Sequence, residues 1–444
     1  MNAADMEEVK KCVLKPKLRF PEFQNVGEWE LKSLGKVYLF KSTNSLSRDK
    51  LNYENGLVKN IHYGDIHTKF STLFNIENEI VPFINLSESL EKIKPENYCV
   101  EGDIVFADAS EDLNDVGKSV EIIHLNGERL LSGLHTLLAR QKENKIKNGF
   151  SGYLFKSDGI RNQIKKEAQG TKVLGISARR LSSIKIYFPR EKKEQQKVAD
   201  CLSSIDDHIT AETQKLDTLK AHKKGLMQQL FPAEGETQPK LRFPEFRNAG
   251  EWESSTLENL CTAKISYGIV QAGPHVPDGM PYIKSMDLNS ALCLARLART
   301  SDAIAQKYRR SEVVPGDLVF SLRGNIGVAQ IVPKDMLVAN LTQGTARIRT
   351  QGPPEFYLQS LRSKPVLSRI LAVSKGSTFQ EISLESLRKI RLFHPEIDEQ
   401  QRISDCLTFL DEMIALQFQR IATLKTHKKG LMQQLFPSLD EVKR

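Results

Sequence analysis

The chain has 444 residues, of which 40% are hydrophobic and 27% are charged, and its formal net charge is +9 at pH 7. This composition excludes a disordered polypeptide and fits two to four folded domains. The excess of basic residues favours a polyanionic partner, of which nucleic acid is the commonest. Charge alone leaves open the alternative of a soluble protein that is merely basic.

The first residues, 1–17, are charged and lack the apolar stretch of a secretory signal, and no apolar run of about 18 residues occurs in the chain. We therefore expect a cytoplasmic protein without a membrane partner. The six cysteines are scattered and form no Cys-x-x-Cys pair. This spacing argues against a zinc site or a disulfide framework, so we expect no metal.

A segment near the start of the chain recurs unchanged further on. Pro16–Phe23 is repeated as Pro239–Phe246, and Gly27–Trp29 returns as Gly250–Trp252 at the same offset of 223 residues. These two places hold the only two tryptophans of the chain. An identical octapeptide followed by a second match at the same offset indicates an internal duplication.

Residues 30–189 mix strand-like runs, such as 104–106 and 184–188, with a helix-like stretch over 158–168. This mixture predicts an α+β domain. In its expected loops lie side chains suited to DNA, where most contacts go to phosphates and a few distinguish bases. For each of these side chains taken alone, the alternative is that it is an ordinary surface residue. The candidates for DNA binding are Lys59, Asn60, His62, Tyr63, Lys118 and Lys172, together with a lysine cluster over 142–156.

A long helix is predicted after Pro189, because no proline or glycine follows until Gly225. Its apolar residues are spaced alternately four and three apart, which is the heptad pattern of a coiled coil. Glu212 and Lys223 interrupt the pattern, and Pro232 ends the helix. The apolar positions are Val198, Leu202, Ile205, Ile209, Leu216, Leu219, Leu226 and Leu230.

Residues 253–395 form a second expected α+β domain, with strand-like runs over 317–320 and 388–393 and a helix-like stretch over 354–373. This domain is the more basic of the two, with 18 Lys or Arg against 11 Asp or Glu. Arginine pairs favourably with guanine, and Asn or Gln with adenine. The candidates for DNA binding here are Lys284, Arg296, Arg299, Arg309, Arg310, Arg323, Asn325 and Gln343.

The long helix itself is duplicated at the end of the chain. Thr218–Pro232 recurs as Thr423–Pro437 with one change, and Glu194–Leu202 closely matches Glu399–Leu407. The heptad spacing is repeated too, with interruptions at the equivalent polar residues. Its apolar positions are Ile403, Leu407, Leu410, Ile414, Ile421, Leu424, Leu431 and Leu435, and its interruptions are Gln417 and Lys428.

Each helix of about 38 residues would span ~57 Å. Since both carry the same apolar seam, the simplest arrangement is an intramolecular antiparallel coiled coil with one recognition domain at each end. The alternative is that each helix pairs with another protein.

The matched end regions of the two copies contrast with their middle regions, 30–189 and 253–395, which share only a few short motifs. Glu101–Phe106 resembles Pro315–Phe320, and Gly170-Thr171 resembles Gly376-Ser377. Similar ends indicate a symmetric scaffold, whereas different middles indicate two different recognised targets. The alternative is that the middle regions simply drifted apart in sequence, but drift alone would not have left the end regions alike.

Motifs for catalysis are missing from the sequence. Gly117-Lys118-Ser119 lacks the earlier glycine of a phosphate-binding loop. Gly352–Phe356 lacks the amide or carboxylate with which adenine methyltransferases hold the target amino group, and no glycine-rich loop for a methyl donor appears. We expect no catalytic residues and no cofactor, which disfavours a solitary nuclease or methylase.

This set of features resembles the specificity subunit of type I restriction-modification systems, and the resemblance covers almost the whole chain. It rests on the octapeptide opening each half, on the Gly-Thr and Gly-Ser marks, and on the long helices running from Glu-Gln-Gln to Gly-Leu-Met-Gln-Gln-Leu-Phe-Pro. The resemblance implies two target recognition domains, each binding one half of a split DNA sequence, with the helices as a spacer.

The resemblance also implies partners: double-stranded DNA, two DNA methyltransferase subunits docked on the helices, and motor-nuclease subunits. The subunit would direct adenine methylation and DNA cleavage without catalysing either. We expect recognition domains over 16–190 and 239–395 and conserved helices over 191–236 and 396–437. The alternative from another class is a free-standing DNA-binding regulator that dimerises through its coiled coil.

Overall fold

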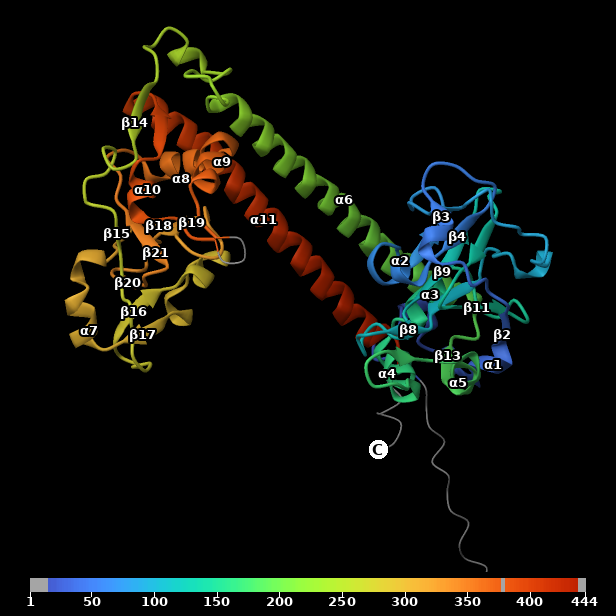
Figure 1. Cartoon of the computed structure of the whole chain (residues 1–444). Coiled ribbons are helices and arrows are strands. Elements are labelled where there is room, and N and C mark those ends of the chain that lie inside the picture. Colours follow the sequence, from blue (N-terminus) through green and yellow to red (C-terminus); the bar gives the residue numbers. More distant parts are fainter. Residues whose placement is uncertain (1–14, 377–379, 438–444) are drawn as a thin grey trace, which may run out of the picture. The chain divides into compact units, whose positions relative to one another are not determined.

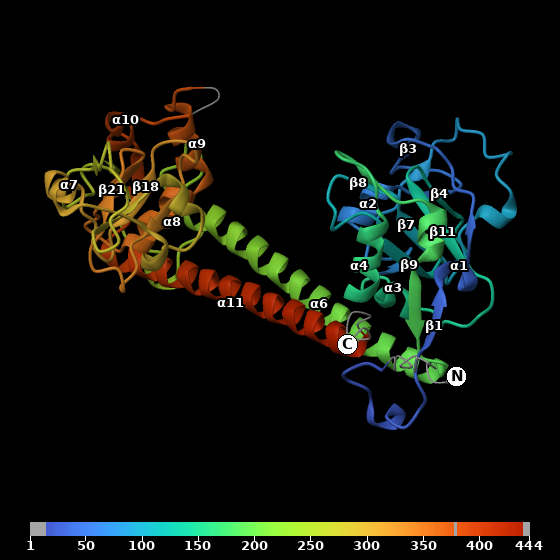
Figure 2. The same cartoon turned by 90° about the horizontal axis from the view of Figure 1, so that it is seen from below.

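The computed structural model describes residues 15–376 and 380–437, and it divides into two compact units. The first unit comprises Met1–Glu212 and Arg420–Arg444, and the second comprises Thr213–Gln419. Each unit therefore combines one α+β domain with a part of each long helix, α6 (Lys192–Leu230) and α11 (Ile397–Leu435). Figures 1 and 2 show both helices as continuous elements.

The first unit is built on two main sheets. The larger has the strand order β2-β11-β7-β9-β5, and all its pairs are antiparallel except β5 with β9. Its strands are β2 (Tyr38–Lys41), β11 (Thr136–Gln141), β7 (Ile104–Ala107), β9 (Ser119–His124) and β5 (Leu73–Asn75). The second has the order β10-β4-β6-β3, with β10 (Leu130–Ser132), β4 (Lys59–Ile61), β6 (Phe83–Ile84) and β3 (Leu51–Asn52).

Two short strand pairs and five helices complete the first domain. The strand pairs are β1 (Glu30–Ser33) with β13 (Lys185–Phe188) and β8 (Ala109–Ser110) with β12 (Leu174–Gly175), both antiparallel. The helices are α1 (Leu34–Val37), α2 (Tyr63–Thr68), α3 (Phe150–Leu154), α4 (Asp158–Glu167) and α5 (Ala178–Ser183).

The second unit repeats this plan with shorter sheets. Its strand orders are β15-β21-β18-β19 and β17-β16-β20, with β14 (Glu253–Thr256) paired to β22 (Arg391–His394). The other strands are β15 (Ser266–Tyr267), β16 (Met280–Ile283), β17 (Ala298–Thr300), β18 (Leu318–Ser321), β19 (Ala329–Ile331), β20 (Asn340–Leu341) and β21 (Thr345–Ile348). The helices are α7 (Asp302–Lys307), α8 (Pro354–Arg362), α9 (Lys364–Ala372) and α10 (Leu384–Arg388).

The predicted strands and helices of both middle regions are confirmed, with two changes. The strand-like run 388–393 gives a shorter strand, β22 (Arg391–His394), because Arg388 is the last residue of α10. The stretch 354–373 was expected as one helix, but it forms α8 and α9, separated at Ser363. Pro365 lies in the first turn of α9, where it needs no backbone N–H bond. A proline ring inside a helix clashes with the carbonyl group four residues earlier, here that of Leu361, so the helix breaks at Ser363 and restarts.

The repeated opening segments pack on the ends of the long helices in each unit. In the first unit, Trp29 stacks edge-on against Phe436 and Phe150, with ring centroids 6.0 Å apart in both pairs. In the second, Trp252 packs in the same way against Phe231 at 6.2 Å and Phe356 at 6.0 Å. Each unit therefore has an aromatic cluster that joins its domain to the end of one helix.

A buried ion pair ties the same segments to the start of the other helix. Arg19 donates from Nε and Nη2 to the two carboxylate oxygens of Glu194, at 2.8 and 2.7 Å. Arg242 makes the equivalent bidentate pair with Glu399. We call these pairs the first and second clasp. They explain why the octapeptide and the Glu-Gln-Gln motif are both repeated, because each clasp needs one residue from each motif.

The helices pair antiparallel within each unit, as predicted. In the first unit the start of α6 shares a core with the end of α11, and in the second the start of α11 shares a core with the end of α6. The polar residues interrupting the heptads are accommodated by partners: Lys428 bonds Asp206 in the first unit, and Lys223 bonds Asp411 in the second. Glu212 is buried and pairs with Arg420 at 2.9 Å.

Candidate DNA interface

Loops from four parts of the first domain meet at one edge, which we call the first edge. The segments are 61–65 after β4, 108–110 after β7, 133–135 before β11, and 169–177 around β12. Backbone bonds hold them together: Gly133 N donates to Ile61 O at 2.9 Å, and Asp108 N donates to His135 O at 3.0 Å. Ile176 N donates to Asp108 O at 2.8 Å.

The second domain has the same edge built from its own loops, which we call the second edge. Thr342 N donates to Ile283 O at 3.1 Å, and Leu322 N donates to Gly344 O at 2.8 Å. Ile382 N donates to Leu322 O at 3.0 Å. These bonds match those of the first edge one by one. They make Leu322 the equivalent of Asp108, and Gly344 the equivalent of His135.

The first edge carries a cluster of aromatic and histidine side chains. Tyr63 packs against His62 with ring centroids 4.6 Å apart, against His135 at 5.3 Å and against His67 at 6.0 Å. His62 caps α2 by accepting a bond from Gly64 N. Burial, with Arg48 nearby, lowers the pKa of His62, so this ring is favoured in its uncharged form.

Acidic and basic groups border this cluster. Asp108 lies 3.2 Å from His135 Nδ1, and burial raises the pKa of this carboxyl, an effect that His135 opposes. Lys118 donates to the backbone oxygen of His67 at 2.6 Å and remains one-third exposed. Lys172 lies exposed in the turn between Gly170 and β12. The first edge thus presents a mixed set of donors and acceptors around a flat aromatic centre.

The second edge carries charged and amide groups instead. Arg323 Nε lies 2.8 Å from Glu381 Oε1, and both side chains are about half exposed, at 46% and 49%. Asn325 Nδ2 donates to Asn289 Oδ1 at 2.6 Å. Lys284 and Gln343 come from the two other loops of this edge. Because an exposed ion pair contributes little to stability, Arg323 can leave Glu381 at small cost.

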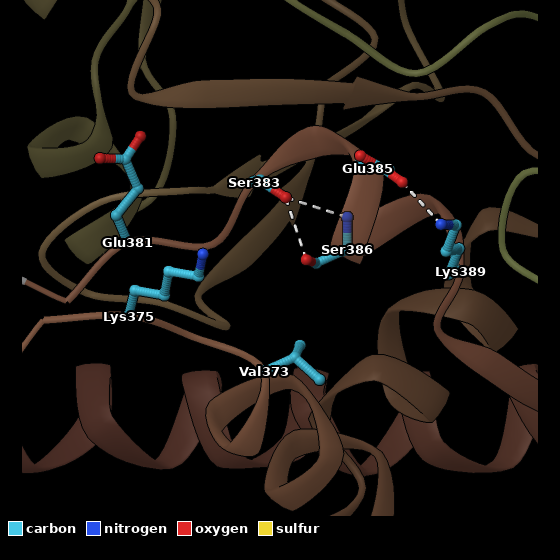
Figure 3. A pocket seen from close by; sticks show the side chains of 7 residues that line it. All are labelled: Val373, Lys375, Glu381, Ser383, Glu385, Ser386 and Lys389. Atoms are coloured by element: carbon cyan, nitrogen blue, oxygen red, sulfur yellow. Dashed lines mark hydrogen bonds and ion pairs between the residues drawn. The ribbon is translucent and has the colours of Figure 1, made fainter.

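A hollow of about 360 Å³ borders the second edge and is drawn in Figure 3. Lys375 and Glu381, which pair through their backbones, line one side of it, and the ion pair of Glu385 and Lys389 lines the other. Ser383 caps α10 between them by accepting from Ser386 N. Of the Gly376-Ser377 mark, Ser377 lies outside the described residues.

The structure brings eight of the fourteen candidates to the two edges and the segments beside them. Lys59 and Asn60 are placed differently: Lys59 pairs with Glu128 at 2.6 Å, and Asn60 is fully buried, accepting a bond from Asn44. From the 142–156 cluster, Lys156 is partly buried, and its removal from water lowers its pKa to about 8. The candidates at the edges are His62, Tyr63, Lys118, Lys172, Arg323, Asn325 and Gln343, and Lys284 begins the short helix beside the second edge.

The remaining basic candidates lie on other segments of the second domain. Arg296 is exposed in a short helix, and Arg299 in β17 donates to Gly279 O at 3.0 Å. Arg309 and Arg310 are exposed in a short helix over Arg309–Ser311. These positions suit contact with phosphates at the flank of a bound duplex better than contact with bases, since they do not converge on one point.

Sequence reasoning missed four side chains of the edges: His67, Asp108, His135 and Glu381. One signal was available. The run from Ile61 to Ile66 shares its isoleucine, aspartate and final aliphatic residue with Ile283 to Leu288, which would have aligned the two edges. That alignment places a loop at the same point of each domain, although it does not show which loops meet there.

A family model described as "Type I restriction modification DNA specificity domain" matches residues 27–221 and again 249–426. The chain belongs to this family. It is therefore a non-catalytic subunit that confers DNA-sequence specificity in a type I restriction-modification complex. The two matches coincide with the two copies of the duplication, and the alternative of a free-standing regulator is not supported.

Similar proteins agree with this assignment. A protein named as the specificity subunit of the type I restriction enzyme MjaX of Methanocaldococcus jannaschii is 25% identical, over 93% of both chains. The EcoBI specificity subunit of Escherichia coli is 29% identical over 34% of this chain and 33% of its own length.

The fold is shared with solved structures. The S subunit of a type I restriction-modification system from M. genitalium has a TM-score of 0.58 at 14% identity, covering 96% of this chain and 99% of its own. A chain from a study of complex assembly and conformational transition of the type I R-M system has a TM-score of 0.56 at 17% identity, covering 92% and 97%.

Two further properties concern only residues 15–376 and 380–437. Within these ranges, no helix combines the length and apolar character needed to cross a membrane. In the same part of the chain, no three His, Cys, Asp or Glu side chains gather into a group that could hold a metal ion.

Proposed function

We propose that the chain binds a two-part DNA sequence, with the first edge contacting one half and the second edge the other. The observation that carries this proposal is the pair of equivalent edges. The same backbone bonds build both, yet the side chains displayed on them differ. Equivalent frames with different side chains suit two half-sites of different sequence.

The residues of the second edge have the chemistry of direct base contacts. Arg323 can donate two bonds to the O6 and N7 atoms of a guanine once it leaves Glu381, and Asn325 or Gln343 can pair with an adenine. Glu381 left behind can accept from the amino group of a cytosine. Basic residues further along the domain, such as Arg309 and Arg310, would neutralise phosphates, so that affinity falls as salt rises.

The partners we propose are two DNA methyltransferase subunits docked on α6 and α11, and motor-nuclease subunits that join for cleavage. In this assembly the chain directs adenine methylation in the cytoplasm and catalyses no step. The repetition of the helices supports two like partners, because two equal surfaces can hold two copies of one protein. We keep 16–190 and 239–395 as the recognition domains, and 191–236 and 396–437 as the conserved helices.

Adenine methylation mapped in the native host, with and without this gene, tests the proposal. We expect a two-part methylated motif that disappears when the gene is deleted. Purification from the same host should give methyltransferase subunits at two per chain. A chain that purifies with none, in a host whose methylation does not depend on it, would contradict the proposal.

A further inference from the structure

His135 has an unusual backbone conformation for its residue type. Its φ is +56°, in the left-handed region, and among the described residues only Asn126 shares a positive φ without being glycine. A left-handed backbone places Cβ close to the following carbonyl oxygen, so glycine is the residue that adopts it most readily. The equivalent position of the second edge is Gly344.

The histidine ring at this strained position is held rather than free. Its Nδ1 lies 3.2 Å from Asp108 Oδ1, and its ring packs roughly perpendicular to that of Tyr63, with ring centroids 5.3 Å apart. The side chain is nevertheless half exposed, at 50%. It also lines an open hollow of about 510 Å³ together with Ala109 and Gly175. Two partners thus fix the ring while one side remains accessible.

The remaining ring nitrogen has no protein partner among the described residues. If Nδ1–H donates to Asp108, the neutral ring presents Nε2 as an acceptor. In the major groove, the donors that such an acceptor meets are the amino groups N6 of adenine and N4 of cytosine. Strain retained at a position where the other copy has glycine favours a role in binding, since residues in rare conformations cluster at functional sites.

We propose that His135 determines specificity at one position of the first half-site, by accepting a hydrogen bond from the amino group of adenine or cytosine. Asp108 and Tyr63 are positioning residues that hold the ring. The inference rests on the proposed two-part recognition and adds the residue and the base chemistry of its first half.

The test uses the full chain with its methyltransferase subunits in the native host, and genome-wide adenine methylation as the readout. His135→Gly removes the ring and suits the left-handed backbone. We expect preference at one position of the first half-site to fall roughly tenfold, with the second half-site unchanged. His135→Asn tolerates the same backbone and should change that preference without loss of folding.

Asn126→Gly is the matched control, because it makes the same backbone change at the other left-handed residue, whose side chain bonds Glu77. It should leave both half-sites as they are. An unchanged first half-site in His135→Gly would overturn the inference. So would equal weakening at both half-sites with a lower melting temperature, which would show a purely structural role. A wild-type chain without a two-part motif would instead overturn the proposed function.

Discussion

The two copies in this chain are alike where their opening segments meet the long helices and different at the two edges. The two clasps have the same chemistry, because each pairs an arginine with a buried glutamate: Arg19 with Glu194, and Arg242 with Glu399. The edges share their backbone bonds but replace the His135–Asp108 contact with Gly344 and the Arg323–Glu381 pair. Duplication has therefore preserved the frame and diversified the displayed side chains.

Burial explains this division. Glu194 and Glu399 are 1% and 2% exposed, so losing one partner would leave a charge without water or a counter-ion. At the edges His135, Arg323 and Glu381 are about half exposed, so water replaces a lost contact at little cost. Substitution is thus restricted in the clasps and permitted at the edges.

The largest effect is expected from breaking a clasp. Glu194→Ala leaves Arg19 without its carboxylate partner and removes the bond that Glu194 accepts from Trp29 Nε1 at 3.1 Å. We expect a loss of about 3–5 kcal/mol of unfolding free energy. Glu399→Ala should cost roughly 1 kcal/mol less, because Trp252 Nε1 is buried without a partner among the described residues.

Denaturant unfolding of the full chain measures both clasp variants. Lys197→Ala is the control, since this exposed lysine makes only a 3.4 Å pair with Glu22 and a contact with the Phe20 ring at 5.7 Å, and its removal should cost less than about 1 kcal/mol. Equal losses for Glu194→Ala and Lys197→Ala would show that the clasp does not stabilise the chain.

A pH dependence should distinguish the two units. Burial raises the pKa of Glu121 to about 7, against bonds from the N–H groups of Gly149 and Gly152. Since the folded pKa exceeds the unfolded one, the folded state binds the proton more tightly. The stabilisation is fully present below about pH 4.5 and is lost as pH rises towards 7. The fall should be on the order of 2–3 kcal/mol.

In the strand register, the residue of the second unit that is equivalent to Glu121 is Ile331. Glu121 lies opposite Ile104 on the neighbouring strand, just as Ile331 lies opposite Leu318. Glu121→Gln should therefore remove the fall in stability. Hydrogen exchange at pH 5 and pH 8 can follow β9 and β19 separately. A fall of equal size in β19, or one that persists in the Gln variant, would exclude Glu121 as its cause.

The smallest of these effects concerns specificity at the second edge. Arg323→Ala should relax one position of the second half-site, a loss of about 1–3 kcal/mol in discrimination, and leave the first half-site intact. Methylation mapping measures this. Lys389→Ala serves as the control, because Lys389 lies on the far side of the neighbouring hollow and pairs only with Glu385. An unaltered motif in Arg323→Ala would remove this residue from the interface.

Much of the scaffold was predictable because it depends on local spacing. The heptads marked the buried positions of α6 and α11, and their polar interruptions marked Lys223 and Lys428, which pair with Asp411 and Asp206. Where prediction went wrong, the reason was also local: Pro365 divided one expected helix into two.

The sequence by itself determined the duplication, the α+β domains, the two long heptad helices and the family, because repeats and periodicity are properties of the chain alone. Only the tertiary structure decided which candidates stand together. It buried Asn60, exposed Arg323 beside Glu381, and brought His135 to Asp108 from 27 residues away. The edges form where loops distant in sequence are joined by backbone hydrogen bonds, and the residue types alone do not indicate which loops make those bonds.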